Sequence, residues 1–367
     1  MSSPLTRPCP AERSSSTVAL SDPDAAFSAL CEDMAEHGLT PERPSAGCAR
    51  VEVDGMTLSL QTSANHLVID VTAPGASGLF FLKEAVTQHI LRIDAAAGAA
   101  MTWSDGGAAD RPPNFQEGRV EGVDHLGDDL LRLDLSVADA GAFARDGLHV
   151  KAMIPARHDR PPVWPRVAAN GTTIWPKGAD ELHVRYYTLR RVDVEAGRVW
   201  IDVVLHPGGR IAGWCETARP GARIGLMGPG GGALPAGDGP ALIVGDRTAL
   251  PAIARLLEDM PDAPRATVVV PRVRLRDGGA YLPDSTHDLV ELDPTIFTDP
   301  SALSEAVGDA ARLAGGPARA WFGGEFDAAL AMRRLFRQEL GLSKGTQMSV
   351  AYWRRGRVTD ASAADEH

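Results

Sequence analysis

The sequence lacks the cysteine and histidine patterns of metal-binding and disulfide-rich proteins. Its four cysteines show no CxxC spacing, and its ten histidines show no metal-ligand pairing. We therefore expect no disulfide framework and no protein-bound metal, and a reducing compartment, the cytoplasm, fits best. Single histidines such as His149 and His183 are expected to be structural or exposed. The cysteines are Cys9, Cys31, Cys48 and Cys215.

An excess of positive charge is also absent. The 37 Lys and Arg residues against 48 Asp and Glu residues give a net charge of -11, which argues against a nucleic-acid partner. No apolar run is long enough to cross a bilayer, and the polar start MSSPLTRPCPAERSSS has no hydrophobic signal region. No GxSxG, HExxH, P-loop or kinase motif occurs. We expect no membrane insertion, and oligomeric state is left open.

What remains is typical of a globular protein with more than one domain. A hydrophobic content of 44% and a charged content of 23% in 367 residues predict two or three domains. Residues 1 to about 20 and the tail 358–367 have the composition of disordered segments. The overall prediction is a multidomain α+β and α/β chain.

The first predicted domain covers residues 20–95. Asp22-Pro23 starts a helix that runs toward Gly38, and Asp54-Gly55 joins two short strands as a hairpin. A strand at 66–72 and a helix near 80–93 complete a small α+β domain of unknown role. The Ala-, Gly- and Pro-rich residues 96–113 are predicted to be a linker.

Two further domains follow. Residues 114–236 carry short strands separated by Gly, Pro and Asp, which predict an antiparallel β-barrel. Residues 237–357 alternate strands with helices, which predicts a doubly wound parallel sheet that binds a nucleotide at the carboxyl ends of its strands.

The barrel contains ELHVRYYTLRRVDV, residues 181–194, a strand crowded with cations and hydroxyls. Arg185 offers a forked donor for a phosphate, Tyr187 on the same face offers a ring to pack on a flat cofactor, and Thr188 offers a hydroxyl. The alternative is an edge strand with solvated cations.

Three other stretches have the residues of a nucleotide site. HPGGRIAGW, residues 206–214, is predicted to be an anion cradle before a helical turn, or else an ordinary glycine turn. LIVGDRTALPAI, residues 242–253, is a strand–turn–helix without the GxGxxG fingerprint. PRVRLR, residues 271–276, follows the second strand, where Arg272 and Arg274 would hold a 2′-phosphate and favour NADPH; a solvated basic loop is the alternative.

These stretches together resemble the siderophore-interacting proteins, FAD-dependent ferric-siderophore reductases related to the ferredoxin reductases. The likeness covers roughly residues 115–357 and is carried by VRYYTLRR, IDVVLHPGG with the following GW, LIVGDRTALPAIARLLEDMP and WFGGEFDAALAMRRLFRQELG leading to AYWRRG. The first domain resembles a small uncharacterised domain sometimes fused ahead of this family.

The resemblance implies FAD as cofactor, NADPH or NADH as electron donor, and a ferric siderophore as substrate. It implies that the flavin and its phosphate contact Arg185, Tyr187 and Thr188. It further implies a flavin lining of Asp202, Val204, Leu205 and His206, and a pyrophosphate loop of Gly208, Gly209 and Trp214. The nicotinamide nucleotide would face Asp246, Thr248 and Ala249, with Glu325, Tyr352 and Trp353 closing the site.

The sequence departs from the family pattern at a few positions. The loop that usually reads Gly-Pro-Ala-Ser is Gly209-Arg210-Ile211-Ala212, and the usual GDETALPA is GDRTALPA, with Arg247 as the new cation. The expected activity is transfer of a hydride from NAD(P)H to flavin and of single electrons to Fe(III). Two alternatives are open: a flavin reductase or diaphorase with another acceptor, and a cofactor-degenerate siderophore-binding protein.

Overall fold

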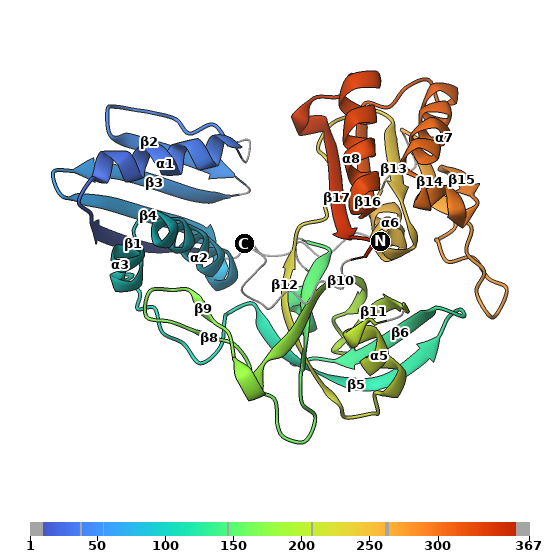
Figure 1. The fold of residues 1–367 in the computed structure, drawn as a ribbon, viewed down its shortest axis with the longest axis horizontal. Coiled ribbons are helices and arrows are strands. Elements are labelled where there is room, and N and C mark those ends of the chain that lie inside the picture. Colours follow the sequence, from blue (N-terminus) through green and yellow to red (C-terminus); the bar gives the residue numbers. More distant parts are fainter. Residues whose placement is uncertain are drawn as a thin grey trace. The chain divides into compact units, whose positions relative to one another are not determined.

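The chain, described by a computed structural model, forms two compact units (Figure 1). The structure describes residues 10–36, 39–53, 55–144, 147–206, 208–260 and 264–356. The first unit runs to Phe115 and takes in Val163–Glu181, and the second comprises Gln116–Pro162 and the chain from Leu182 on. Residues 1–9 and the tail 358–367, both expected to be disordered, lie outside the described residues.

The first unit contains a four-stranded antiparallel sheet of order β1-β4-β3-β2. Its first strand corrects the expectation of disorder up to residue 20, because β1 pairs with β4 along its whole length. The composition of β1 is polar, yet its side chains Ser14, Ser16 and Val18 are buried. Burial of every second residue is the pattern of a strand with one face in the core. The hairpin expected at Gly55 is confirmed by β2 and β3, although Asp54 lies outside the described residues. The strands are β1 (Ala11–Ala19), β2 (Cys48–Val53), β3 (Met56–Ser63) and β4 (His66–Pro74).

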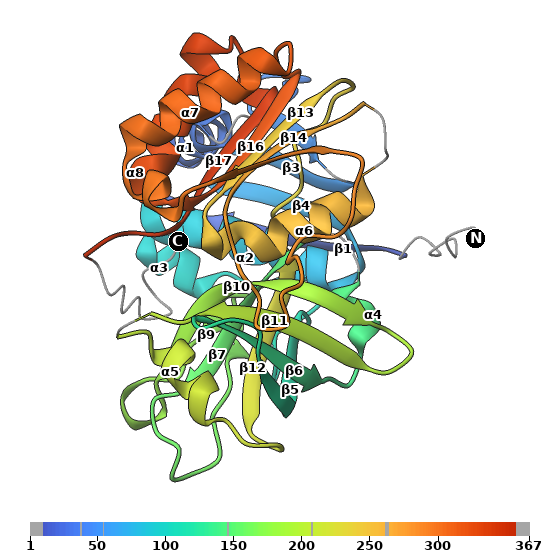
Figure 2. The same cartoon turned by 90° about the vertical axis from the view of Figure 1, so that its right-hand side faces the viewer.

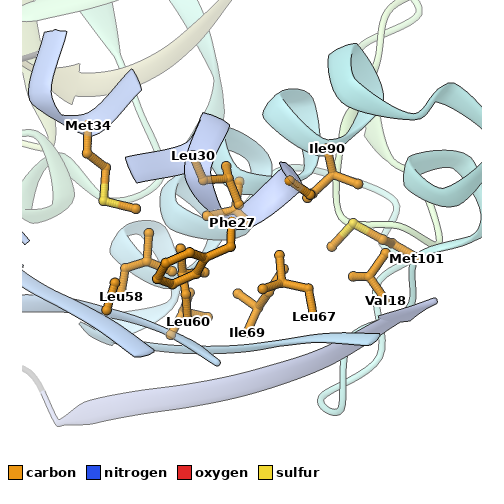
Figure 3. Close-up of a cluster of buried hydrophobic side chains, with 14 of the residues drawn as sticks. Val18, Phe27, Leu30, Met34, Leu58, Leu60, Leu67, Ile69, Ile90 and Met101 are labelled. Atoms are coloured by element: carbon orange, nitrogen blue, oxygen red, sulfur yellow. The ribbon is translucent and has the colours of Figure 1, made fainter. Parts of the chain in front are cut away.

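Both expected helices of this unit are confirmed and cover one face of the sheet. Helix α1 (Pro23–Glu36) and helix α2 (Gly75–Ile93) bring their apolar residues onto the strands. Figure 3 shows Phe27 and Leu30 of α1 and Ile90 of α2 directed toward side chains of the strands. The labelled residues there are Val18, Phe27, Leu30, Met34, Leu58, Leu60, Leu67, Ile69, Ile90 and Met101.

Residues 96–113 belong to this core, which corrects the predicted linker. Helix α3 (Ala95–Ala100) follows α2 at once, and Met101 and Trp103 are buried in the same hydrophobic cluster. Asp105 accepts hydrogen bonds of 2.8 Å at both carboxylate oxygens from the buried Lys83. The Ala- and Gly-rich composition gave no sign of these few anchoring side chains.

Residues Val163–Glu181 also pack in the first unit, although they fall inside the range expected for the barrel. Asn170 ties this segment to the core: its amide nitrogen donates to the Gly98 carbonyl at 3.1 Å, and its backbone carbonyl accepts from Trp103 Nε1 at 2.9 Å and Thr87 Oγ1 at 3.1 Å. The segment holds β8 (Arg166–Val167), β9 (Thr173–Ile174) and the 3-10 turn η1 (Gly178–Asp180).

The second unit begins with the closed antiparallel barrel expected from the sequence. Its strand order is β10-β11-β6-β5-β12-β7, and its inward side chains form one apolar cluster that includes Val150, Leu189 and Ile201. Two short helices, α4 (Ala140–Phe143) and α5 (Arg210–Thr217), pack on that cluster. The strands are β5 (Phe115–His125), β6 (Leu130–Ser136), β7 (His149–Pro155), β10 (Leu182–Asp193), β11 (Arg198–Val204) and β12 (Arg223–Gly230).

The doubly wound parallel sheet is confirmed in the same unit. Its order is β15-β14-β13-β16-β17, with all pairings parallel. Figure 2 shows α6 on one side of these strands and α7 and α8 on the other, and two separate apolar clusters fill the two faces. The order reverses between β13 and β16, so the loops that follow these two strands diverge at that point.

The sequence did not predict β15 and β17 as strands; both lie at the edges of the sheet and are less apolar than the central strands. The parallel strands are β13 (Ala241–Gly245), β14 (Thr267–Pro271), β15 (Asp288–Leu292), β16 (Arg319–Glu325) and β17 (Gln347–Trp353). The helices are α6 (Leu250–Asp259), α7 (Pro300–Leu313) and α8 (Phe326–Arg334), which continues as the π-helix η4 (Leu335–Glu339). The 3-10 turns are η2 (Arg247–Ala249), η3 (Pro294–Thr298) and η5 (Lys344–Thr346).

Asn170→Ala tests whether Val163–Glu181 is part of the first unit's core. The change removes the amide that satisfies the buried Gly98 carbonyl, so we expect a loss of about 2 kcal/mol in the unfolding free energy of that unit. Urea denaturation followed by circular dichroism and tryptophan fluorescence measures it. Asn65→Ala, in the exposed turn before β4, is the matched control. Equal stability of the two variants would contradict the anchoring role.

Candidate functional site

The loop between β11 and α5 has the geometry of an anion cradle. Gly208 has φ +80°, and Gly209 precedes α5 without a side chain that caps its first backbone N–H groups. A Cβ built on Gly209 would lie 2.7 Å from the His206 ring. Gly209, the N-cap residue, makes no side-chain hydrogen bond to the first turn of α5, which is the position where helices bind anions.

Strand β10 places the Arg185 side chain on the face that meets the start of α5. His183 and Tyr187 lie on the strand face that meets α5: the Arg210 guanidinium is 3.1 Å from His183 Nδ1, and Tyr187 packs with the cluster that contains Cys215. Arg185 stands between them in the strand, with the same direction. Its guanidinium donates to its neighbour's carbonyl, Val184 O, at 2.6 Å, and among the described residues it has no carboxylate partner.

Tyr187 and Trp214 provide the apolar wall of this region. Burial raises the pKa of the Tyr187 phenol well above its usual range, and the Arg185 charge opposes this. The phenol is therefore neutral at any physiological pH. Trp214 of α5 packs partly buried on the same barrel cluster.

Asp202 does not face this cradle with a free carboxylate. Arg132 donates two hydrogen bonds of 2.7 Å to its two oxygens, and the Tyr281 hydroxyl donates another at 2.5 Å. Tyr281 lies between β14 and β15, so this buried carboxylate joins the barrel to the sheet. Val204 packs against the sheet cluster, while Leu205 packs on the barrel cluster.

The loops at the reversal point of the sheet hold the second group of predicted site residues. Asp246 follows β13, and its carboxylate accepts from Thr248 N at 2.8 Å, Thr248 Oγ1 at 2.6 Å and Trp353 Nε1 at 2.7 Å. Burial raises the pKa of Asp246, and the neutral donors only partly offset it. Ala249 is fully buried next to Gly245, where a Cβ would come within 2.6 Å of its methyl group.

Glu325, at the end of β16, is used as a helix cap. Its carboxylate accepts from the backbone N–H groups of Asp327 at 2.6 Å, Ala328 at 3.2 Å and Arg355 at 3.1 Å. The cap fixes the start of α8 and the chain that follows β17. The side chain is buried and satisfied by protein donors.

Arg272 and Arg274 lie exposed just after β14. Neither forms a salt bridge with a carboxylate of the described residues, although the Arg272 charge acts on the Asp293 carboxylate. The Arg272 backbone is fixed, because its N–H donates to the Leu292 carbonyl at 2.9 Å. The two guanidinium groups are thus available at the strand end where a ribose 2′-substituent would lie.

His149 joins the two groups; the sequence predicts a structural or exposed histidine here, but not these two partners. Its Nδ1 is 3.3 Å from Thr188 Oγ1 on β10, and its Nε2 is 3.1 Å from the Tyr352 hydroxyl on β17. A lone histidine carries no motif, and its partners lie 39 and 203 residues away along the chain. The cross-strand register that pairs it with Thr188 is visible only in the folded barrel.

Comparison with known proteins agrees with this arrangement. Residues 119–233 match the model of the siderophore-interacting FAD-binding domain, and residues 240–356 match that of the siderophore-interacting protein. The chain belongs to the siderophore-interacting protein family.

Individual proteins are similar to about two thirds of the chain. The ferric vibriobactin reductase ViuB of Vibrio cholerae is 27% identical over 256 residues, which cover 66% of this chain and 90% of ViuB. The structure of SipS from Aeromonas hydrophila superposes with a TM-score of 0.52 at 26% identity, covering 66% of this chain and 93% of SipS. A siderophore utilization protein from T. fusca gives 0.51 at 25% identity, covering 68% and 96%.

The structure explains the family departure at Arg247. Its guanidinium forms an ion pair with Asp129, in the turn between β5 and β6. The Asp129 carbonyl also accepts from the Leu205 N–H at 2.8 Å. Asp129 therefore ties the loop of the cradle to the turn after Asp246, and the added cation serves the barrel–sheet junction.

The described part of the chain lacks two further features. None of its helices is long and apolar enough to span a bilayer. Its His, Cys, Asp and Glu side chains include no group of three or more that could hold a metal ion.

Arg247→Glu, which restores the family's usual residue, tests the junction ion pair. The change sets two carboxylates against each other, so we expect the unfolding free energy to fall by up to about 1 kcal/mol, because the pair is partly exposed. Asp129→Arg in the same chain should recover most of that loss. Urea denaturation measures both, with Arg157→Glu as the control for an exposed ion pair with Asp159. If Arg247→Glu lowers the unfolding free energy no more than Arg157→Glu does, the ion pair with Asp129 does not stabilise the junction.

Proposed function

We propose that the chain is an NAD(P)H-dependent flavoprotein reductase that releases iron from ferric siderophores by reducing Fe(III) to Fe(II), in the cytoplasm. The observation that carries this proposal is the cradle formed by Arg185, Gly208, Gly209 and the uncapped start of α5. It offers a permanent cation and a helix start without a side-chain cap, at one end of a barrel that matches the siderophore-interacting FAD-binding domain.

The residues of the cradle fit FAD. The diphosphate would take the backbone N–H groups of the first turn of α5 and the Arg185 guanidinium, which has no competing carboxylate among the described residues. Tyr187 and Trp214 would supply aromatic surface for the flavin, with Leu205 and His206 at its edge. Asp202 and Val204 would support the site without contacting the flavin through their side chains, because those side chains pack toward the sheet.

When bound, FAD supplies the redox chemistry by accepting a hydride from NAD(P)H and returning single electrons to Fe(III). The chain's own groups bind and orient. Tyr187 stays protonated and adds no charge, and the Thr188 hydroxyl can hydrogen-bond the ring edge. The siderophore carries its own iron ligands, so the reaction needs none from the protein.

The electron donor would bind at the reversal point of the parallel sheet. Asp246, Thr248 and Ala249 form the turn after β13, and Trp353 lies over it, 40% exposed, with its indole N–H on Asp246. Tyr352 would face the nicotinamide, and Glu325 would hold the loop in place through the start of α8. Arg272 and Arg274 would take a 2′-phosphate, which makes NADPH the preferred donor.

Anaerobic titration tests the proposal and its alternatives. Purified protein should be yellow, NADPH should bleach the flavin, and a ferric siderophore should restore the colour while Fe(II) is trapped by a chelator. Recovery of the colour only with other acceptors would indicate a diaphorase. Failure to bind FAD at all would favour a siderophore-binding protein. The ferric siderophore is the first acceptor to test, because ViuB is described as a reductase of ferric vibriobactin.

Arg185→Ala should release FAD without unfolding the barrel. A charged hydrogen bond contributes ~1.5–3 kcal/mol, so the dissociation constant should rise about 10- to 100-fold. Isothermal titration of apo-protein measures it. Arg191→Ala is the control in the same strand, since that side chain is 67% exposed. Unchanged affinity in Arg185→Ala would remove β10 from the flavin site.

Replacing Arg272 and Arg274 together by Ala should discriminate between the two nicotinamide nucleotides. The KM for NADPH should rise about 10- to 100-fold, as expected for the loss of charged contacts to a phosphate. The KM for NADH should change by less than about threefold, because NADH has no 2′-phosphate. Steady-state kinetics at fixed acceptor concentration measures both. Equal effects on the two nucleotides would mean that the arginines are a solvated loop.

A further inference from the structure

His149 lies where the barrel and the parallel sheet of the second unit meet. It is the first residue of β7, and it is the cross-strand partner of Thr188. Its ring reaches Thr188 Oγ1 with Nδ1 at 3.3 Å and the Tyr352 hydroxyl with Nε2 at 3.1 Å. One side chain thus touches a predicted flavin residue and a predicted nicotinamide residue.

The surroundings hold the ring in one orientation. The Tyr352 ring meets it edge to face, with centroids 5.3 Å apart and an angle of 82°, and Trp321 meets the same tyrosine at 75°. Gly232, with φ +88°, passes so close that a Cβ there would lie 2.7 Å from Nε2. Any larger residue at position 232 would displace the imidazole, so the backbone leaves room for this one placement.

The ring is neutral under physiological conditions. Burial, together with the charge of the Arg255 guanidinium on α6, lowers the pKa of His149 to about 4. Of its other neighbours, Thr188 on β10 does not titrate, the Tyr352 phenol on β17 has a pKa raised by burial, and the segment at Gly232 is uncharged. A neutral imidazole has one donor and one acceptor. It can therefore link two hydroxyl groups without placing a cation between them.

We propose that His149 is a positioning residue that fixes Thr188 and Tyr352 relative to each other, and so sets how the flavin and nicotinamide sides of the site meet. The proposal rests on the proposed function. It gives His149 no contact with the cofactors, and its effect passes through the two hydroxyl-bearing side chains.

Three substitutions separate the two contacts. His149→Phe keeps a ring but loses both, so we expect the FAD dissociation constant and the KM for NADPH each to rise about tenfold, the value of one hydrogen bond. His149→Asn places its amide near Nδ1 and should restore FAD affinity alone. His149→Gln places its amide near Nε2 and should restore the KM for NADPH alone. A purely structural role would move both parameters together in all three variants.

His125→Phe is the control, because that histidine is exposed at the end of β5. It should match the wild type in both parameters. The proposal is overturned if His149→Phe also matches the wild type, or if the Asn and Gln variants show the same pattern.

Measurements on the protein without FAD test the placement of His149 independently of the proposed function. In apo-protein, Thr188→Val should shift the His149 Nδ1 resonance and Tyr352→Phe should shift Nε2, as measured by imidazole nitrogen NMR. Lowering the pH from about 6.5 to about 4 should also lower the Tm of the wild type by about 5 °C more than that of His149→Phe, because only the unfolded wild-type chain takes up this proton. The Asn and Gln variants serve the same comparison if the Phe variant does not fold.

If the wild type binds no FAD, the proposed function fails while the NMR and pH measurements still decide the placement of His149. Unshifted resonances together with an unchanged pH dependence would overturn the placement, even in a protein that binds FAD.

Discussion

The buried carboxylate of Asp202 is the constraint on which the arrangement of the second unit depends. A carboxylate without exposure must be paired or it destabilises the fold by several kcal/mol. Arg132 of the barrel satisfies part of it, and Tyr281 of the sheet satisfies the rest. Neither half can therefore move away without leaving a buried charge short of a partner. The barrel and the sheet form a single compact unit accordingly.

Close backbone packing imposes the second constraint, at the reversal point of the parallel sheet. A Cβ on Gly324 would lie 2.7 Å from Asp246 Oδ2, and one on Gly323 would lie 2.7 Å from the Trp321 ring. The turns after β13 and β16 approach each other only because these positions lack side chains. Asp246 is consequently enclosed by neutral donors, which positions Trp353 above it. The geometry of the nucleotide loop thus follows from glycines as much as from its polar residues.

Much of this fold was predictable because local patterns dominate it. The helix from Pro23, the hairpin at Gly55, the barrel and the alternating strands and helices after residue 241 all carry strong periodic or turn signals. The failures share a cause. Strand β1 is polar, and residues 96–113 are Ala- and Gly-rich, so their structure comes from partners distant in sequence, such as β4 and Lys83.

The candidate site shows the same division. The residues of the cradle could be proposed from the sequence, because an arginine, glycines and aromatic residues recur there at recognisable spacing. The sequence did not predict that protein groups donate hydrogen bonds to the Asp202 and Glu325 carboxylates. Two of the donors, Tyr281 and Arg355, are 79 and 30 residues away along the chain. The partners of His149 were not predictable for a related reason, because they follow from the register of β7 with β10. Sequence patterns locate groups that act through their own chemistry better than groups that act by holding others.

Arg247 shows how a departure from a family pattern can leave a site intact. At the turn after β13 a cation next to Asp246 would alter the field at the proposed nicotinamide position. The guanidinium instead pairs with Asp129, and Asp246 keeps only the neutral donors of Thr248 and Trp353. The new charge is thereby compensated at the junction, where Asp129 also anchors Leu205. The substitution then adds a link between the loop after β11 and the turn after β13, which leaves both loops of the proposed site in place.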